Sequence, residues 1–310
     1  MDPNISNYLS GFRLGELQIF ENMAIVPLFT SPNGGPDYGL LRDAMDQALI
    51  TITEVDRSGS VPELKVTTTS PLPILLLDGE ELIGARQDRV LNTSILLKGN
   101  SETLIPVSCT EQGRWHYTSA AFSDSGVIMS HRSRASKTDT VTGSLRSKRG
   151  YSSDQIRVWS DIETLHRKAG TTSQTRAMRD VYTAKTQDLG AYLDAFECAA
   201  HQQGSLVFIN GEPVGLDVVP RQRAYRALHP KLIKSYAIDA LLQSRDKCEA
   251  PSLAKAKSFL QEAQNCEDNI FTSVGLGYDY RFWGRQIVGS ALVFEGHIVH
   301  LALFRLDKRG

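Results

Sequence analysis

Apolar positions along the chain predict a strand-rich first part. Short apolar runs rich in β-branched residues are bounded there by turn-forming residues, which is typical of buried strands. These predicted strands lie at residues 17–28, 51–55, 64–68, 74–77, 95–97 and 104–107. One helix is expected among them, over residues 37–49, because its apolar residues recur at the 3.6-residue period of a helix face.

Beyond residue 153 the apolar residues recur mainly at helical spacing. The predicted helices cover residues 154–168, 174–185, 189–201, 231–242 and 253–263. Asp188 suits the N-cap of the third helix, and Pro230 suits the first turn of the fourth. Two β-hairpins are expected between them, at residues 206–219 and 292–304, around an Asn-Gly and a Glu-Gly turn. Their shared Leu-Val-Phe start indicates either a remnant internal repeat or the general likeness of buried hairpins.

The two parts are separated by a basic segment, residues 126–153. Between residues 131 and 149 it has six basic residues and a single acidic one, Asp139. The basic residues are Arg132, Arg134, Lys137, Arg146, Lys148 and Arg149. Because the segment lacks a periodic apolar face, we expect a flexible loop. It would be either a solvated surface loop or a lid that orders over an anionic ligand, since arginine binds phosphate oxygens through paired hydrogen bonds.

These elements predict an α+β fold. A β-rich N-terminal half, residues 1–125, would pack against a helical C-terminal half, residues 154–310, that carries the two hairpins. The basic loop of residues 126–153 would join the halves into one compact unit.

Composition narrows the class of protein. The chain has 310 residues, 41% of them hydrophobic and 22% charged, as expected for a globular protein. A formal net charge of −1 gives no overall attraction to nucleic acid or to a membrane, so neither is an expected partner. No secretory signal and no run of about 20 apolar residues is found. The oligomeric state stays open.

The cysteines and histidines predict a reduced protein without a bound metal. Four cysteines are present, without a Cys-x-x-Cys pair: Cys109, Cys198, Cys248 and Cys266. Such sparse cysteines favour a reducing, cytoplasmic compartment. The seven histidines have no metal-binding spacing, so neither a structural zinc nor another cofactor is expected.

The chain's densest polar set lies in residues 75–115, between the predicted core strands. Its members are Asp78, Glu80, Glu81, Arg86, Gln87, Arg89, Asn92, Ser108, Cys109, Glu111, Gln112 and Arg114. Charged groups and amides next to buried strands are costly to desolvate unless they pair or bind a ligand. We therefore expect these side chains to be buried and mutually paired around a shared site.

Three local features each allow a functional and a structural interpretation. Glu80 and Glu81 are either acid–base or ligand-orienting carboxylates beside anion-binding arginines, or part of a surface turn with weak ion pairs. Cys109 is either a nucleophile activated by a nearby base, or a small buried residue. The loop of residues 275–281 either places Asp279 and Arg281 in a cleft or is a plain turn.

Several segments together resemble a known bacterial family. They are DGEELIGARQDRVLNTSILL, IPVSCTEQGRW, SYAIDALL and GLGYDYR, at residues 78–97, 105–115, 235–242 and 275–281. They are similar to the signature segments of the domain family named for its association with ADP-ribosylglycohydrolases and the rhodanese/phosphatase superfamily. The resemblance spans residues 24–304. It implies a connection with NAD and ADP-ribose metabolism, without specifying a reaction.

The predicted function is binding, and in the enzyme interpretation hydrolysis, of a small anionic nucleotide-derived ligand such as ADP-ribose. The candidate catalytic residues are Glu80, Glu81 and Glu111. The candidate ligand-binding residues are Gln87, Arg89, Asn92, Cys109, Gln112, Arg114, Asp279 and Arg281. Arg89 and Arg114 would hold phosphate, while Gln87, Asn92 and Gln112 would contact hydroxyls. The alternative is a non-catalytic scaffold whose polar cluster is a structural ion-pair network.

Overall fold

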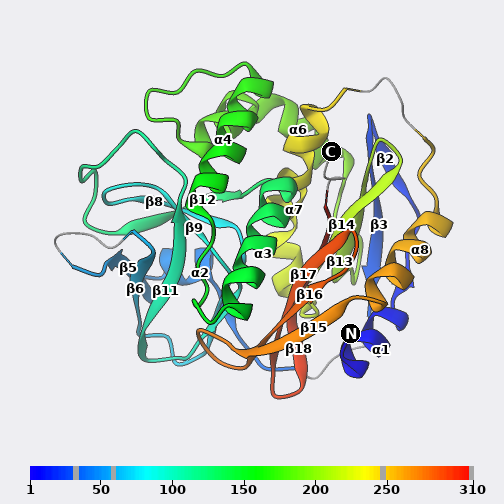
Figure 1. Cartoon of the computed structure of the whole chain (residues 1–310), viewed down its shortest axis with the longest axis horizontal. Coiled ribbons are helices and arrows are strands. Elements are labelled where there is room, and N and C mark those ends of the chain that lie inside the picture. Colours follow the sequence, from blue (N-terminus) through cyan, green and yellow to red (C-terminus); the bar gives the residue numbers. More distant parts are fainter. Residues whose placement is uncertain (31–34, 57–60, 245–248, 307–310) are drawn as a thin grey trace. The chain divides into compact units, whose positions relative to one another are not determined.

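The computed structural model describes residues 1–30, 35–56, 61–244 and 249–306 (Figure 1). Helices and strands are mixed along this part of the chain, so the predicted α+β class is confirmed. The N-terminal half is rich in strands, and further strands lie near the C-terminus. The chain forms two compact units. The first comprises residues 1–36, 187–271 and 278–310, and the second residues 37–186 and 272–277.

The first unit is built on one sheet of nine strands among the described residues. Its order is β1-β3-β13-β14-β18-β17-β16-β15, with β2 paired to β3. The strands are β1 (Arg13–Leu14), β2 (Gln18–Phe20), β3 (Met23–Phe29), β13 (Gly204–Ile209), β14 (Glu212–Val218), β15 (Glu267–Thr272), β16 (Tyr278–Trp283), β17 (Ile287–Phe294) and β18 (His297–Arg305). Both predicted hairpins are confirmed, as β13–β14 and β17–β18.

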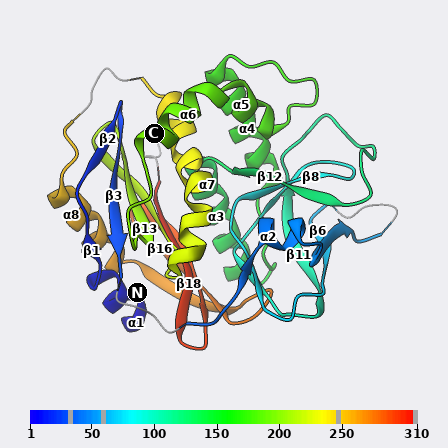
Figure 2. The same ribbon diagram turned by 180° about the vertical axis from the view of Figure 1, so that it is seen from behind.

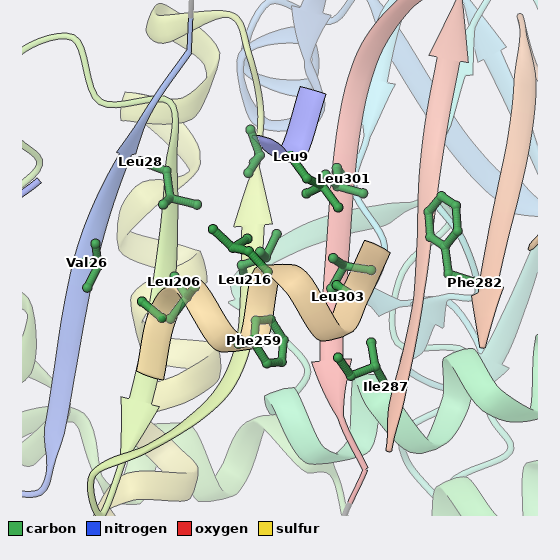
Figure 3. Close-up of a cluster of buried hydrophobic side chains, with 14 of the residues drawn as sticks. Leu9, Val26, Leu28, Leu206, Leu216, Phe259, Phe282, Ile287, Leu301 and Leu303 are labelled. Carbon is green, nitrogen blue, oxygen red and sulfur yellow. The ribbon is translucent and has the colours of Figure 1, made fainter. Parts of the chain in front are cut away.

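One face of this sheet forms the hydrophobic core of the first unit. Helices α1 (Pro3–Ser10) and α8 (Leu253–Gln264) contribute to the same apolar cluster. Figure 3 shows Leu206, Leu216, Leu303 and Phe259 among its side chains, and Figure 2 shows the unit from behind. Alternate residues of each strand point to the same face, which explains the apolar pattern along the strands.

The opposite face of the sheet carries polar side chains and is contacted by α7 (Gln222–Leu241). Asp217 is central there. It accepts a hydrogen bond from the Tyr236 hydroxyl at 2.7 Å and lies 3.2 Å from Nε2 of His300. All three side chains are almost completely buried. The remaining helix assigned mainly to this unit is α6 (Thr186–Ala195).

The described residues of the second unit form two smaller sheets. One has the order β10-β7-β4, and the other β12-β8-β9-β11-β6-β5. The strands are β4 (Gly39–Leu40), β5 (Ile50–Glu54), β6 (Glu63–Thr68), β7 (Ile74–Leu76), β8 (Glu80–Gly84), β9 (Arg89–Leu91), β10 (Ile95–Leu97), β11 (Ser101–Cys109) and β12 (Phe122–Ile128). Their apolar residues form a separate core with α2 (Leu41–Asp46).

The basic segment is not a flexible loop. Residues His131–Arg146 form helix α3, which begins after Ser130, whose side-chain oxygen accepts a hydrogen bond from the Ser133 amide. Arg134 and Lys137 are buried and form ion pairs with Asp78. The expectation of a loop, and of a lid made by it, is therefore wrong. The segment has little apolar periodicity because it buries small polar and paired charged residues in place of a hydrophobic stripe.

The other helices of the second unit are α4 (Gln155–Ala169) and α5 (Met178–Ala184). Two further sequence expectations are wrong. Helix α6 begins at Thr186, so Asp188 lies in its first turn and is not its N-cap. Helix α7 begins at Gln222, so Pro230 lies inside it and not in its first turn. None of the described helices combines the length and the apolar character needed to cross a membrane.

Candidate functional site

The polar set of residues 78–114 belongs entirely to the second unit and is largely buried there. Glu80, Glu81, Arg89, Asn92 and Glu111 are each no more than 1% exposed. The side chains divide into groups that are joined by hydrogen bonds and ion pairs, so the expectation of buried, mutually paired side chains is confirmed. An exception is Gln112, which is exposed and accepts a hydrogen bond from Arg176 at 3.1 Å.

The first group contains three carboxyl groups, those of Glu81, Asp88 and Glu111. Arg114 joins two of them, since its Nη2 lies 3.0 Å from Oδ1 of Asp88 and its Nε lies 2.8 Å from Oε2 of Glu111. Arg179 adds a second guanidinium, with Nε 3.1 Å from Oδ2 of Asp88. We call these five residues the carboxyl cluster.

Local backbone geometry brings the carboxyl cluster together. Glu81 lies on β8, Asp88 in the turn before β9, and Glu111 just after β11. These strands are neighbours in the order β8-β9-β11. The segment that carries Arg179 is held against the end of β11 by a hydrogen bond from the Met178 amide to the Thr110 carbonyl at 2.9 Å. Residues far apart in sequence thus meet at one end of the sheet.

The hydrogen-bond donors of Arg114 all bind acceptors within the protein. Besides the two carboxylates, its Nη1 donates to the carbonyls of Ala85 at 2.7 Å and His116 at 3.1 Å. Its Nη2 also donates to the carbonyl of Gly84 at 3.4 Å. A guanidinium has five N–H donors, and these contacts use all five. Arg114 therefore holds the cluster and the adjoining turn together, in place of the phosphate contact expected from the sequence.

Burial sets the protonation of Glu81. It raises the pKa of Glu81 to about 8, and the neighbouring Asp88 carboxylate acts in the same direction. The hydroxyls of Thr110 and Ser125 and the Arg179 guanidinium act in the opposite direction, but they do not compensate. A buried carboxyl group beside another carboxylate is favoured in its neutral form. Glu81 is therefore mainly a neutral acid at pH 7.

The pKa values of the other two carboxyl groups of the cluster shift in opposite directions. The pKa of Asp88 is raised, by burial and then by the Glu111 carboxylate. The pKa of Glu111 is lowered, because hydrogen bonds from Arg114, Thr175 and the Asp88 amide outweigh the effect of burial. A neutral acid thus lies in one cluster with a carboxylate held in its charged form. This is a chemical requirement for combined general acid and general base catalysis.

A second group consists of neutral side chains, and we call it the amide network. Asn92 donates to the Tyr151 carbonyl at 2.9 Å and accepts from the Ser108 hydroxyl at 2.6 Å. Ser108 also bonds to the Ser153 hydroxyl. Gln155, at the start of α4, accepts from the Cys109 amide at 2.8 Å and donates to the Cys109 carbonyl at 2.9 Å. These contacts fasten α4 to strand β11.

Cys109 belongs to this network through its backbone. Burial raises the pKa of its thiol, and the Arg89 guanidinium opposes the shift without reversing it. A nucleophilic cysteine needs the opposite shift, toward the thiolate. Cys109, Cys198 and Cys266 are free thiols, while Cys248 lies outside the described residues. The geometry therefore favours the interpretation of Cys109 as a small buried residue.

The remaining candidates have local partners. Arg89 donates to the Gln87 side-chain oxygen at 3.2 Å, and Gln87 donates to the Glu111 carbonyl at 2.8 Å. Glu80 accepts the Leu77 amide hydrogen at 2.8 Å and so closes the turn between β7 and β8. These contacts give Gln87, Arg89 and Glu80 roles in positioning the backbone around the carboxyl cluster.

Asp279 and Arg281 belong to the first unit. Both are buried on strand β16, and Arg281 Nη2 donates to Asp279 Oδ2 at 2.7 Å. Two residues apart on a strand, they share one face of the sheet. The glycine-rich loop before them, residues 272–277, is assigned to the second unit.

Sequence reasoning did not identify three parts of the site: Asp88, Thr110 and Arg179. Asp88 and Thr110 lie inside the polar segments of residues 78–97 and 105–115. The polar character of these segments pointed to their neighbours Gln87, Arg89, Cys109 and Glu111, but not to Asp88 and Thr110 themselves. Arg179 lies more than 60 positions beyond Arg114, the last residue of the polar set, and no sequence pattern connects it with Asp88. Among the described residues, no group of three or more His, Cys, Asp and Glu side chains could hold a metal ion.

The comparisons with known proteins identify one family. The model of the ARG and Rhodanese-Phosphatase-superfamily-associated Protein domain, in which ARG stands for ADP-ribosylglycohydrolase, matches residues 11–304. No curated protein and no solved structure matches the chain.

Proposed function

Because the chain belongs to the ARG and Rhodanese-Phosphatase-superfamily-associated Protein domain family, we propose that it binds an anionic nucleotide-derived ligand, with ADP-ribose the first candidate. We propose further that it hydrolyses this ligand at the carboxyl cluster. The observation that carries the proposal is the neutral state of Glu81 beside ionised Glu111, inside a cluster that also holds two arginines.

Arg179 supports a ligand at this place because it is the part of the cluster that reaches solvent. Its side chain is 41% exposed, whereas that of Asp88 is fully buried. An anionic group that binds the exposed side of Arg179 would lie next to the acidic groups. Arginine is well suited to this task because its planar donors match the oxygens of a phosphate.

In the proposed reaction, the Glu111 carboxylate accepts a proton from the attacking water, and the water oxygen forms the new bond to the substrate. The bond to the leaving group breaks, and the leaving group takes its proton from the Glu81 carboxylic acid. Proton exchange between the two carboxyl groups and solvent then restores the starting state. Such paired acid–base catalysis contributes about 10²–10⁴-fold per proton transfer.

A thermal-shift screen with ADP-ribose, NAD, AMP and ribose 5-phosphate tests binding. At ~100 times its dissociation constant, a ligand should stabilise the native protein by about 2.7 kcal/mol. Arg179→Ala should reduce this shift, whereas Arg167→Ala, a matched change on the exposed part of α4, should not. If none of the four compounds shifts the unfolding transition, the binding proposal is wrong.

Hydrolysis is tested separately with Glu81→Gln. The variant should keep the thermal shift by ADP-ribose and lose turnover, because glutamine retains the shape of the side chain but cannot donate an acidic proton. Turnover at the wild-type rate in this variant would exclude Glu81 as the general acid.

The second candidate function, a non-catalytic scaffold, is favoured by one observation. The Arg114 guanidinium uses all its donors on protein acceptors, as a structural ion-pair network would. In that interpretation Glu81→Gln changes stability alone, and the wild-type protein shows no turnover and no thermal shift with any of the four compounds.

A further inference from the structure

Thr110 joins the separate segments of the carboxyl cluster. It lies directly after β11 and is fully buried. Its amide donates to the Asp88 carbonyl at 3.0 Å, and its carbonyl accepts the amide hydrogen of Met178, next to Arg179, at 2.9 Å. Its hydroxyl donates to Oε1 of Glu81 at 2.9 Å. These backbone contacts hold the hydroxyl against Glu81, which is mainly neutral at pH 7.

A hydroxyl suits this place because it can bond to both protonation states of Glu81. A neutral carboxyl group can donate or accept a hydrogen bond, whereas a carboxylate can only accept. The Thr110 hydroxyl can rotate about its C–O bond, so it can donate to the carboxylate that remains after the proton has left. Hydrogen bonds to a charged acceptor are stronger than those between neutral groups. The hydroxyl therefore stabilises ionised Glu81 more than neutral Glu81.

The other groups around Glu81 leave this task mainly to Thr110. Oε2 of Glu81 is buried and has no hydrogen-bond partner among the described residues. The hydroxyl of Ser125, on β12, acts on the pKa of Glu81 in the same direction as Thr110 but more weakly. Of the charged neighbours, Asp88 raises this pKa, and Arg179 lowers it less than either hydroxyl does. Loss of the Thr110 hydroxyl should therefore make release of the Glu81 proton less favourable.

We propose that Thr110 is a positioning residue for proton release by Glu81, an inference that rests on the proposed function. Its hydroxyl holds Oε1 in place while Glu81 is the acid, and it donates to the Glu81 carboxylate once the proton has passed to the leaving group. The O–H bond that breaks is that of Glu81, whose oxygen keeps the electron pair, while Thr110 keeps its own proton. Thr110 thus acts through Glu81 and is not itself a catalytic residue.

Thr110→Val tests the proposal, because valine has nearly the shape of threonine and leaves both backbone contacts in place. In a ¹³C NMR titration of the glutamate carboxyl carbons, the Glu81 signal is the one absent from Glu81→Gln. Its midpoint should rise by about one pH unit in Thr110→Val, the size expected for loss of a hydrogen bond to a charged group. Thr110→Ser keeps a hydroxyl and should remove most of this rise. An unchanged midpoint in Thr110→Val would contradict the proposal.

Two control variants show whether the rise is specific. Thr142→Val removes a buried hydroxyl of α3 that donates to the Thr138 carbonyl at 2.8 Å, and it should leave the Glu81 midpoint unchanged. Ser125→Ala should raise the midpoint by less than Thr110→Val does. An equal rise in Thr142→Val would refute the proposal, because loss of any buried hydroxyl would then have the same effect.

The same titration separates positioning from a merely structural role. A structural role alone would make Thr110→Val less stable than the wild type and leave the Glu81 midpoint in place. If Thr110→Val does not fold, Thr110→Ala replaces it, since the smaller side chain cannot clash with its neighbours. The rise expected for Thr110→Ala is the same, and its absence would count equally against the proposal.

The pH dependence of ADP-ribose hydrolysis connects Thr110 with the reaction. Because Glu81 must be protonated and Glu111 ionised, kcat/KM should fall as pH rises through the Glu81 pKa. Thr110→Val should move this fall to higher pH by the amount seen in the NMR titration, and leave the acidic side of the profile in place. If the profiles of the two proteins coincide, hydrolysis stands and the role of Thr110 is wrong. If the NMR midpoint rises but the wild type does not hydrolyse ADP-ribose, the coupling of Thr110 to Glu81 stands and the proposed hydrolysis is wrong.

Discussion

The carboxyl cluster and the amide network lie on the same sheet of the second unit, yet their buried polar groups are paired in different ways. In the amide network, neutral donors and acceptors are matched in pairs, as between Gln155 and the backbone of Cys109. In the carboxyl cluster, three acids meet two guanidiniums, and one acid, Glu81, remains mainly protonated at pH 7. A buried network with matched partners has a structural role. A buried surplus acid is costly and can move a proton, which favours a functional role.

Among the substitutions in the two groups, removal of the Arg114 side chain should lower the free energy of unfolding most. Arg114→Ala leaves Asp88 and Glu111 buried without their shared guanidinium. Breaking a buried ion pair in this way costs about 3–5 kcal/mol. Chemical denaturation should show a loss of this size, and the exposed Arg167→Ala should stay within about 0.5 kcal/mol of wild type. Equal losses in both variants would refute the structural role of Arg114.

The pH dependence of stability should distinguish Glu81 from the amide network. The pKa of Glu81 is raised in the folded protein from 4.5 to about 8. Its contribution to stability is fully present below about pH 4.5 and is lost as pH rises toward about 8, because the unfolded state releases the proton first. The slope is at most about 1.4 kcal/mol per pH unit.

Glu81→Gln should abolish this slope, so that the variant gains stability relative to wild type between pH 5 and pH 8. Denaturation at several pH values measures the difference. Parallel stability curves for the two proteins would contradict a raised pKa at Glu81.

Asn92→Ala should weaken the amide network without a pH signature. It removes the donor to the Tyr151 carbonyl and one of the two hydrogen-bond partners of the buried Ser108 hydroxyl, which keeps Ser153. Leaving a buried polar group unsatisfied costs about 1–3 kcal/mol. The loss, measured by denaturation, should be the same at pH 5 and pH 8. A loss that varies with pH would connect the network to the titrating cluster.

Cys109→Ala should have the smallest effect. The contacts of Cys109 with Gln155 use backbone atoms, so they persist in the variant. We expect a stability loss of about 1 kcal/mol or less, and unchanged hydrolysis of ADP-ribose where the wild type is active. Loss of turnover with unchanged folding would instead restore the catalytic interpretation of Cys109.

The sequence predicted those features that depend on local pattern. The Asn-Gly turn at residues 210–211 identified one hairpin, because that dipeptide suits a tight turn. The polar stretch between core strands identified Glu81 and Glu111. Helix α3 was missed, because Arg134 and Lys137 are buried through ion pairs that a hydrophobic pattern does not reveal.

Two further features depend on residues that only the fold brings together. Arg179 meets Asp88 because a turn and a helix start converge, and no spacing rule connects positions 88 and 179. The raised pKa of Glu81 depends on burial and on Asp88 together. Neither the contact nor the degree of burial follows from the order of residues alone.

The protonation state of Glu81 is the central claim, and ¹³C NMR titration of the glutamate side-chain carboxyl carbons tests it most directly. The Glu81 signal is identified by its absence in Glu81→Gln. We expect it to titrate with a midpoint of about 8, so that the group is mainly neutral at pH 7. A midpoint near 4.5, the value of an unperturbed glutamate, would contradict the account.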